Sequence, residues 1–402
     1  MRPPVNTKSP RTDRADHATG SAEAILERLV AFDTTSAKSN LELIAYVKDY
    51  LAGEGVESTL VPAPDGQPKA CLYATIGPTN RAGVGLSGHT DCVPVTGQAW
   101  DTDPFTLTER EERLYARGSA DMKGFVACML ASVPAYKRRN LAVPVHLLLS
   151  YDEEVGCKGV RPMIAEFGKT LQRPRLVVVG EPTMMQVVDA HKGPNRFEVT
   201  VTGLDAHSSM PHLGVNAIMV AARLIGELQR IEADLKERHF SARFTPPYST
   251  IQVGRIEGGT APNIVPRRCS FIWDVRALPG FDARGVAAEL EGFAARELLP
   301  QMHAVSPDCR IEIAPVNTAP AFAAEEGSEA VSLAMRLAGQ NETFAVAYGT
   351  EASFFQEGAC PSVVIGPGDI AQAHKPNEFI ARSELAKCMG FLDRLGDWAA
   401  AG

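Results

Sequence analysis

The chain has 402 residues, of which 45% are hydrophobic and 22% charged, and its formal net charge is −8. This composition is ordinary for a globular protein and provides enough material for two domains. The negative charge argues against nucleic acid or an anionic membrane as a partner, and no apolar run is long enough to predict a membrane span. Residues 1–20 are polar and lack the apolar segment of a secretory signal, so we expect a flexible tail.

The eight cysteines are spread singly along the chain, without a CxxC pair. This spacing predicts free thiols in a reducing compartment, and we therefore expect a cytoplasmic protein.

Helical and strand patterns alternate over residues 21–193. Amphipathic or apolar spacing predicts helices over 22–32, 40–52 and 125–137. The strands predicted in this part are 58–61, 70–76, 84–87, 143–149 and 176–179, with a hairpin over 107–114. Apart from His146, the last two strands are apolar, which is typical of strands buried on both faces.

The pattern changes at residue 194. Strands are predicted over 196–202, 250–256, 268–276 and 309–315, and helices over 215–235 and 282–298. This β-α-β-β-α-β order predicts a separate α+β domain over residues 194–316. The segment 317–402 returns to the first pattern, with helices over 328–338 and 381–399 and strands over 343–348 and 362–365. We therefore expect residues 21–193 and 317–402 to form one α/β domain, with a mixed sheet between two helical layers.

Imidazole and carboxylate groups follow the ends of several predicted strands. His89 and Asp91 leave a strand end on the same side, where a carboxylate can orient an imidazole that binds a metal. In the open sheets of α/β proteins, ligands collect at the carboxyl ends of the strands. The groups placed at such positions are His89, Asp121, Glu154, Glu181 and His374.

Two imidazoles and three carboxylates suit Zn²⁺, Co²⁺ or Mn²⁺. If one carboxylate bridges two ions, each ion receives one imidazole and one further carboxylate, and one acid of the Glu153–Glu154 pair is left to carry protons. The alternatives are a helix cap for Asp121 and a solvated turn for the acidic run. No GxGxxG motif opens a predicted helix, which argues against a nucleotide-binding loop, and no GxSxG motif is present, which argues against a serine hydrolase.

Five motifs, from about residue 21 to the C-terminus, together resemble the di-zinc aminoacylase and carboxypeptidase-like amidohydrolases. They are Gly88-His89-Thr90-Asp91-Cys92-Val93-Pro94, Asp121-Met122-Lys123-Gly124, Asp152-Glu153-Glu154, Gly180-Glu181-Pro182-Thr183 and Ala373-His374-Lys375-Pro376. The resemblance implies two Zn²⁺ per subunit, with Co²⁺ able to substitute. One ion would be held by His89, Asp121 and Glu181, and the other by Asp121, Glu154 and His374, with Asp121 bridging. Asp91 would orient His89, and Glu153 would be the general base and acid.

The resemblance also assigns roles to the inserted domain, which would be a lid that forms a homodimer. His207 would stabilise the oxyanion, in its own or the neighbouring subunit's site. Asn263 and Arg276 would bind the carboxylate of the substrate, and a structural ion pair is the alternative for Arg276. Glu351 would bind the side-chain amine of the substrate, with a helix cap as the alternative.

Further stretches resemble the family members that act on acetylated ornithine. They are Asp101-Thr102-Asp103-Pro104-Phe105, Ala190-His191-Lys192-Gly193, Tyr348-Gly349-Thr350-Glu351-Ala352 and the segment from Gly366 to His374. The resemblance implies a small-molecule N-acyl amino acid substrate, and specifically hydrolysis of N2-acetyl-L-ornithine to L-ornithine and acetate for arginine synthesis. Acetylcitrulline or a succinylated diaminopimelate is the alternative substrate. A non-catalytic metal-binding dimeric scaffold is the alternative from another class, and the intact Glu153 argues against it.

Overall fold

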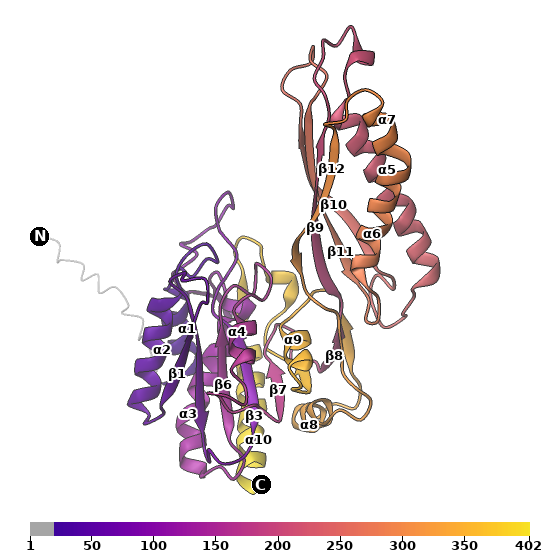
Figure 1. Cartoon of the computed structure of the whole chain (residues 1–402). Coiled ribbons are helices and arrows are strands. Elements are labelled where there is room, and N and C mark those ends of the chain that lie inside the picture. The colour runs from indigo at the N-terminus through magenta and orange to yellow at the C-terminus, as the bar shows by residue number, and fades with distance from the viewer. Residues whose placement is uncertain (1–19) are drawn as a thin grey trace, which may run out of the picture.

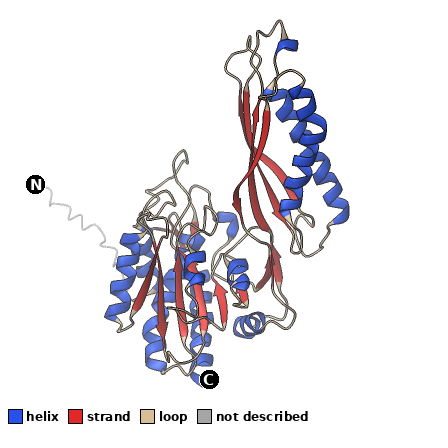
Figure 2. Cartoon of the chain, in the orientation of Figure 1, coloured by secondary structure: helices blue, strands red, loops and turns tan. Residues whose placement is uncertain are grey.

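The computed structural model describes residues 20–402, so the tail expected over residues 1–20 lies outside the described range except for Gly20. Two separate β-sheets organise this range, and the part built on the smaller sheet projects away from the part built on the larger one (Figures 1 and 2). We call these the large-sheet part and the small-sheet part. Across residues 20–402, no helix is long and apolar enough to cross a membrane.

The large sheet is mixed, as expected, and runs in the order β1-β2-β6-β3-β7-β15-β8-β13, with β14 paired to β8. Its strands are β1 (Ser58–Pro62), β2 (Ala70–Ile76), β3 (Val84–His89), β6 (Val145–Ser150), β7 (Leu176–Val179), β8 (Val188–His191), β13 (Phe322–Ala323), β14 (Phe344–Val346) and β15 (Ser362–Val364). The central strands β6, β3, β7 and β15 are parallel neighbours. Their carboxyl ends therefore meet at one edge of the sheet.

Helices cover both faces of the large sheet, which confirms the expected α/β/α layers. One face packs against α1 (Ala22–Val30), α2 (Leu41–Gly53), α3 (Gly124–Arg139), α8 (Glu329–Ala338) and α10 (Arg382–Ala401). The other face packs against α4 (Val160–Ala165) and α9 (Ala352–Glu357).

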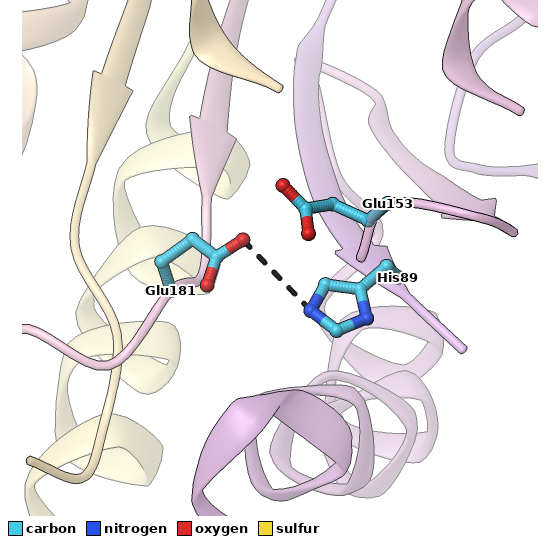
Figure 3. Close-up of side chains that lie close together, drawn as sticks. All are labelled: His89, Glu153 and Glu181. Carbon is cyan, nitrogen blue, oxygen red and sulfur yellow. Dashed lines mark ion pairs between the residues drawn. The ribbon is translucent and has the colours of Figure 1, made fainter. Parts of the chain in front are cut away.

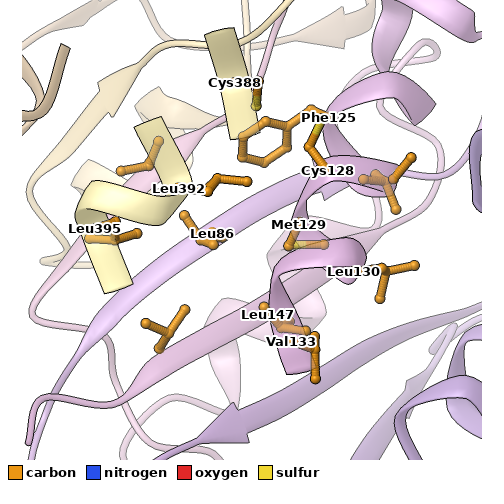
Figure 4. Packing of buried hydrophobic residues seen from close by; sticks show 14 of the residues in the cluster. Leu86, Phe125, Cys128, Met129, Leu130, Val133, Leu147, Cys388, Leu392 and Leu395 are labelled. Atoms are coloured by element: carbon orange, nitrogen blue, oxygen red, sulfur yellow. The ribbon is translucent and has the colours of Figure 1, made fainter. Parts of the chain in front are cut away.

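The core between α3, α10 and the sheet contains Met129 and Val133 from α3, Leu392 from α10, and Leu86 and Leu147 from the strands (Figure 4). All five side chains are fully buried. Each buried aliphatic side chain stabilises the fold by roughly 1.5–3 kcal/mol, so this layer fixes the strands that lead to the site.

The small sheet consists of β9 (Gly193–Thr202), β10 (Thr250–Gly258), β11 (Arg268–Ala277) and β12 (Arg310–Thr318). Its order is β10-β11-β9-β12, and all neighbours are antiparallel. The helices α5 (Ala217–Arg238), α6 (Ala283–Phe293) and α7 (Leu299–His303) cover one face and build a core of their own. In that core Trp273 stacks on Phe197, with ring centroids 4.7 Å apart.

The chain passes between the two parts at two adjacent points. β8 ends at His191 and β9 begins at Gly193, while β12 ends at Thr318, which pairs with Asn195. A Cβ at Gly193 would lie 2.5 Å from the backbone nitrogen of Ala321, so this close approach of two backbones requires glycine.

Several short elements were not predicted. β8, β13, α4 and β16 (Phe379–Ala381) have six residues or fewer, which is too short for a periodic pattern to stand out. The predicted hairpin is present as β4 (Thr108–Arg110) and β5 (Arg113–Tyr115), which form a third sheet with β16. The helix predicted over 282–298 is divided into α6 and a π-helical segment, η3 (Ala294–Leu298).

Candidate metal centre

The candidate ligands converge at the carboxyl edge of the central parallel strands. His89 is the last residue of β3, and its Cα partner in β6 is Ser150. Glu154 follows the end of β6, and Glu181 follows the end of β7. The remaining two ligand candidates come from loops, since Asp121 lies in η1 (Ser119–Lys123) and His374 follows η4 (Ile370–Gln372).

Asp121 lies between the two imidazoles. Its Oδ1 is 3.0 Å from Nε2 of His89, and its Oδ2 is 3.3 Å from Nε2 of His374. Nε2 of His374 also lies 2.9 Å from Oε2 of Glu154, and Nε2 of His89 lies 3.9 Å from Oε1 of Glu181. Each carboxylate oxygen of Asp121 thus faces one imidazole that has a further carboxylate beside it, which is the arrangement a bridging ligand requires.

The helix-cap alternative for Asp121 is wrong. The N-cap position of α3 is Lys123 instead of Asp121, and the start of this helix has no side-chain capping bond. The carboxylate is therefore directed at the imidazoles instead of at the start of the helix.

Ligand atoms also gather in two overlapping triplets, each within 4.8 Å: His89 with Glu153 and Glu181, and His89 with Asp121 and Glu154. Figure 3 shows the first triplet, in which the carboxylates of Glu153 and Glu181 approach the His89 ring from β6 and β7. The resemblance gave Glu153 no ligand role, so the division of ligands between two ions stays a prediction.

The charge balance of this cluster fits divalent cations. His89, Glu181 and Asp121 are 1%, 4% and 6% exposed. Within residues 20–402, Asp121, Glu154 and Glu181 form ion pairs with imidazoles alone and with no lysine or arginine. Buried carboxylates that lack a fixed cation are costly, and ions bound by the imidazole nitrogens and carboxylate oxygens present here would remove that cost.

Burial dominates the protonation of the acids. It raises the pKa of Glu153 to about 8 and of Glu154 to about 7, and that of Glu181 well above its usual range. Burial alone would also raise the pKa of Asp121, but hydrogen bonds with His374 and His89 outweigh it and lower that pKa. Hydrogen bonds to Asp121 and Glu154 raise the pKa of His374 to about 10. The protein thus favours a charged Asp121 between the imidazoles.

Asp91 contacts both the His89 imidazole and the backbone of the Glu153–Glu154 pair. Nδ1 of His89 lies 2.9 Å from the backbone oxygen of Asp91 and 3.5 Å from its Oδ1. A proton on Nδ1 therefore points toward Asp91 and leaves Nε2 directed at Asp121. The carboxylate of Asp91 also accepts hydrogen bonds from the backbone N–H groups of Glu153 (3.0 Å) and Glu154 (3.3 Å).

Sequence reasoning gave Cys157 no role at the site. Its thiol donates to Oε1 of Glu153 at 3.3 Å, in a tight turn where the N–H of Cys157 also bonds the backbone oxygen of Glu153. Cys157 has a positive φ of 50°, which a spacing pattern does not reveal.

The predicted residues of the inserted segment do not lie together. His207 and Asn263 are exposed and adjoin each other in loops beyond the far end of β9, where Ser208 N–H donates to the backbone oxygen of Asn263 at 3.0 Å. Arg276 lies at the near end, paired with Pro194 of β9. At about 3.3 Å per residue, the length of β9 separates the two places by roughly 30 Å. The loops beyond the end of β9 lie far from the large-sheet part (Figure 1), so in one chain His207 is remote from the metal-ligand cluster.

Two local contacts bear on these residues. Nδ1 of His207 is 2.7 Å from Oγ of Ser209, so the hydroxyl can donate to Nδ1 and leave Nε2–H as a free donor. The Nε of Arg276 donates to Oδ2 of Asp274 at 2.9 Å, so the ion pair considered for Arg276 is present.

Glu351 lies beside the ligand cluster but is buried, with 1% of its surface exposed. Its Oε2 accepts a hydrogen bond from Oγ of Ser87 at 3.2 Å, two residues before His89. Glu351 occupies the N-cap position of α9, but its side chain makes no capping bond, so the carboxylate does not serve as the helix cap. Burial raises the pKa of this carboxyl to about 7.

A mixed α/β/α sheet with this cluster at its carboxyl edge defines a metal-dependent amide hydrolase. The chain belongs to peptidase family M20/M25/M40, whose family model matches residues 85–396. This match confirms the family resemblance drawn from the five motifs.

Among curated relatives, an acetylornithine deacetylase from Yersinia pestis is 37% identical over 372 residues, covering 91% of this chain and 93% of the relative. An acetylornithine deacetylase from Myxococcus xanthus is 36% identical over 375 residues, covering 92% of this chain and 95% of the relative. The names of both relatives agree with the narrower resemblance to family members that act on acetylated ornithine.

Solved structures share the fold at low sequence identity. An M20 family metallo-carboxypeptidase from Sulfolobus solfataricus has a TM-score of 0.75 at 20% identity, covering 95% of this chain and 99% of that chain. A dinuclear metal-binding peptidase of the M20 family from Bacillus subtilis has a TM-score of 0.67 at 16% identity, covering 93% and 96%. These likenesses concern the fold alone.

Proposed function

We propose that the protein hydrolyses N2-acetyl-L-ornithine to L-ornithine and acetate, in the cytoplasm and as a step of arginine synthesis. The observation that carries the chemistry is the position of Asp121, with one oxygen 3.0 Å from His89 Nε2 and the other 3.3 Å from His374 Nε2. The choice of substrate is supported by the relatives at 36–37% identity, which are acetylornithine deacetylases.

We assign the cofactor as two Zn²⁺ per subunit, with Co²⁺ able to substitute. His89, Asp121 and Glu181 would hold one ion, and Asp121, Glu154 and His374 the other. Bound there, the ions would polarise the acetyl carbonyl and lower the pKa of a water molecule toward 7. The donor set of imidazole nitrogens and carboxylate oxygens suits zinc and cobalt alike.

The protein's own groups supply the remaining chemistry. Glu153 accepts a proton from the attacking water and passes it to the departing α-amine. Burial, which raises the pKa of this carboxyl in the metal-free protein, makes it a stronger base than an exposed glutamate. Asp91 fixes the orientation of the His89 ring and the position of the Glu153 backbone through the contacts described above. Nε2–H of His207 donates to the oxyanion that develops at the acetyl group.

The distance between His207 and its own cluster supports action across a homodimer. His207 and Asn263 would enter the partner subunit's site, while Arg276, at the near end of the sheet, would bind the substrate carboxylate in its own subunit. Apolar side chains are exposed around the tip that carries His207: Met210 (45%), Leu213 (53%), Met219 (64%) and Ile264 (42%). Such a patch is typical of a surface that associates.

Glu351 is our candidate for the side-chain amine of ornithine. Its Oε1 is buried and has no hydrogen-bond partner among residues 20–402, so an ammonium group placed against it would supply the missing donor. A charged amine would satisfy that oxygen, whereas the uncharged ureido group of citrulline would not neutralise the carboxylate.

The test is a free-amine release assay on metal-loaded protein with chelator controls. It compares N-acetylornithine, N-acetylcitrulline and N-succinyl-diaminopimelate. We expect acetylornithine to lead by tenfold or more in kcat/KM, which is about 1.4 kcal/mol of transition-state preference. A lead by another substrate would overturn the assignment of Glu351 but keep the hydrolase. Turnover of none of them with metal bound would favour a non-catalytic scaffold.

A further inference from the structure

Glu378 closely follows His374 in the chain, but its carboxylate lies against the segment that carries Asp121. The side chain is 1% exposed. Its Oε1 accepts hydrogen bonds from the backbone N–H groups of Ala120 (2.9 Å) and Asp121 (3.1 Å), and its Oε2 accepts one from Gly118 (3.1 Å). One carboxylate thus fixes the backbone of the bridging ligand.

Arg117 completes the surroundings of this carboxylate. It is also 1% exposed, and its Nη1 donates to Oε2 of Glu378 at 2.7 Å. Its guanidinium carbon lies 5.1 Å from the ring centroid of Trp100, in a cation–π contact. A buried ion pair of this kind offsets the cost of desolvation through its hydrogen bonds. Both carboxylate oxygens of Glu378 are satisfied here, as are Nη1 and Nη2 of Arg117, while Nε of Arg117 has no hydrogen-bond partner among the described residues.

The second terminal nitrogen of the Arg117 guanidinium connects this carboxylate, through Gln98, to the backbone of His374. Its Nη2 donates to Oε1 of Gln98 at 2.5 Å, and Nε2 of Gln98 donates to the backbone oxygen of His374 at 2.9 Å. A continuous series of hydrogen bonds therefore joins the backbone of Asp121 to that of His374 through Glu378, Arg117 and Gln98. The series also contacts the loop of residues 98–105, because the N–H of Arg117 donates to the backbone oxygen of Pro104.

We propose that Glu378 and Arg117 are positioning residues that fix the spacing between Asp121 and His374, and thereby set the affinity for the ion held on the His374 side. This proposal rests on the two-metal centre of the proposed function. Metal–ligand distances tolerate about 0.2 Å, so a small slip of either loop would separate the two ligands. The His89 side depends less on this series, because His89 is the last residue of β3 and Glu181 lies two residues after the end of β7.

The experiment measures binding of Co²⁺ to the metal-free full chain by calorimetry and by visible absorption, without substrate. The variants are Glu378→Gln and Gln98→Ala. Loss of such supporting contacts typically costs 10–100-fold in metal affinity. We expect Glu378→Gln to weaken the second Co²⁺ by tenfold or more with little change in the first, and Gln98→Ala to act in the same direction with a smaller change. Raising free Co²⁺ should restore turnover in both.

The matched control is Tyr136→Phe, which removes a buried hydrogen bond from Tyr136 Oη to the backbone oxygen of Leu392 (2.8 Å) between α3 and α10. It should lower thermal stability and leave both Co²⁺ affinities unchanged. If Glu378→Gln binds both Co²⁺ ions with the affinities of the wild type, the proposal is wrong. If Glu378→Gln does not fold, the same result for Gln98→Ala overturns the proposal. A wild-type chain that binds fewer than two Co²⁺ overturns the two-metal centre of the proposed function instead.

Discussion

The carboxylate of Asp91 accepts a hydrogen bond from the backbone N–H of Glu153 at 3.0 Å. The residue expected to orient His89 therefore also positions the proposed general base, which lies in the loop after β6. Position and basicity of the two groups are linked through one side chain that is 2% exposed.

Asp91→Asn tests this link. The amide nitrogen cannot accept a hydrogen bond, so at least one of the donors at Glu153, Glu154 or Ser36 loses its acceptor. We expect kcat to fall at least tenfold and metal affinity to weaken, with a smaller change in KM. Steady-state kinetics and metal analysis of the purified variant measure these quantities. A kcat/KM within twofold of the wild type would exclude the positioning role.

Glu153→Ala tests the proton carrier. Removal of a general base typically costs 10²–10⁴-fold in rate, so we expect kcat to fall by roughly that factor while metal content stays at the wild-type value. Glu326→Ala is the control, because Glu326 is exposed on the large-sheet part and remote in sequence from every ligand candidate. Activity that survives in Glu153→Ala would assign the proton transfer to another group.

Action of His207 across the dimer can be tested by complementation. His207→Ala and Glu153→Ala chains with different affinity tags are co-expressed, and the mixed dimer is purified through both tags. Each single variant should be inactive. The mixed dimer should have about half the wild-type activity, because one of its two sites combines an intact Glu153 with an intact partner His207. An inactive mixed dimer would place His207 in its own subunit's site.

His146 predicts a pH dependence of stability that is separate from the metal centre. It is fully buried, with Nδ1 2.9 Å from Oη of Tyr73, and burial lowers its pKa to about 4. Because the folded pKa lies below the unfolded value of about 6.5, His146 contributes fully above pH 6.5 and its contribution is lost as the pH falls through 4. The loss amounts to about 3 kcal/mol.

The measurement compares urea unfolding of the wild type and His146→Gln between pH 7.5 and 4. The difference between the two free energies of unfolding should change by about 3 kcal/mol in favour of the variant as the pH falls. The metal ligands titrate equally in both proteins and cancel in the difference. Parallel curves would show that His146 does not titrate in this range.

The ligands at strand ends could be predicted because apolar runs, such as those of β6 and β7, identify buried strands in a single sequence. Glu154 and Glu181 follow these runs directly, and parallel neighbours bring their carboxyl ends to one edge. The β-α-β-β-α-β order of the small sheet was visible for the same reason, since its elements are long enough to show their periods.

Other features depend on contacts between distant segments and leave no local pattern. The contact of Glu378 with Gly118, Ala120 and Asp121 joins positions more than 250 residues apart. The burial of Glu351 depends on Ser87 of β3, 264 residues away. A charged residue next to a ligand motif is equally compatible with exposure to solvent, so sequence alone could not distinguish these cases.

The adjacent crossing points of the chain also have an evolutionary consequence. Residues 193–318 leave and re-enter the large-sheet part side by side, where Thr318 pairs with Asn195 and Ala319 N–H bonds the backbone oxygen of Pro194. A segment whose two ends lie close together can be gained, exchanged or lost as a unit without changing the strand order of the sheet into which it is inserted. We call residues 193–318 the cassette. The five ligand candidates all lie outside this cassette, so a new substrate preference can be acquired by recombination at two neighbouring positions while the hydrolytic centre is inherited unchanged.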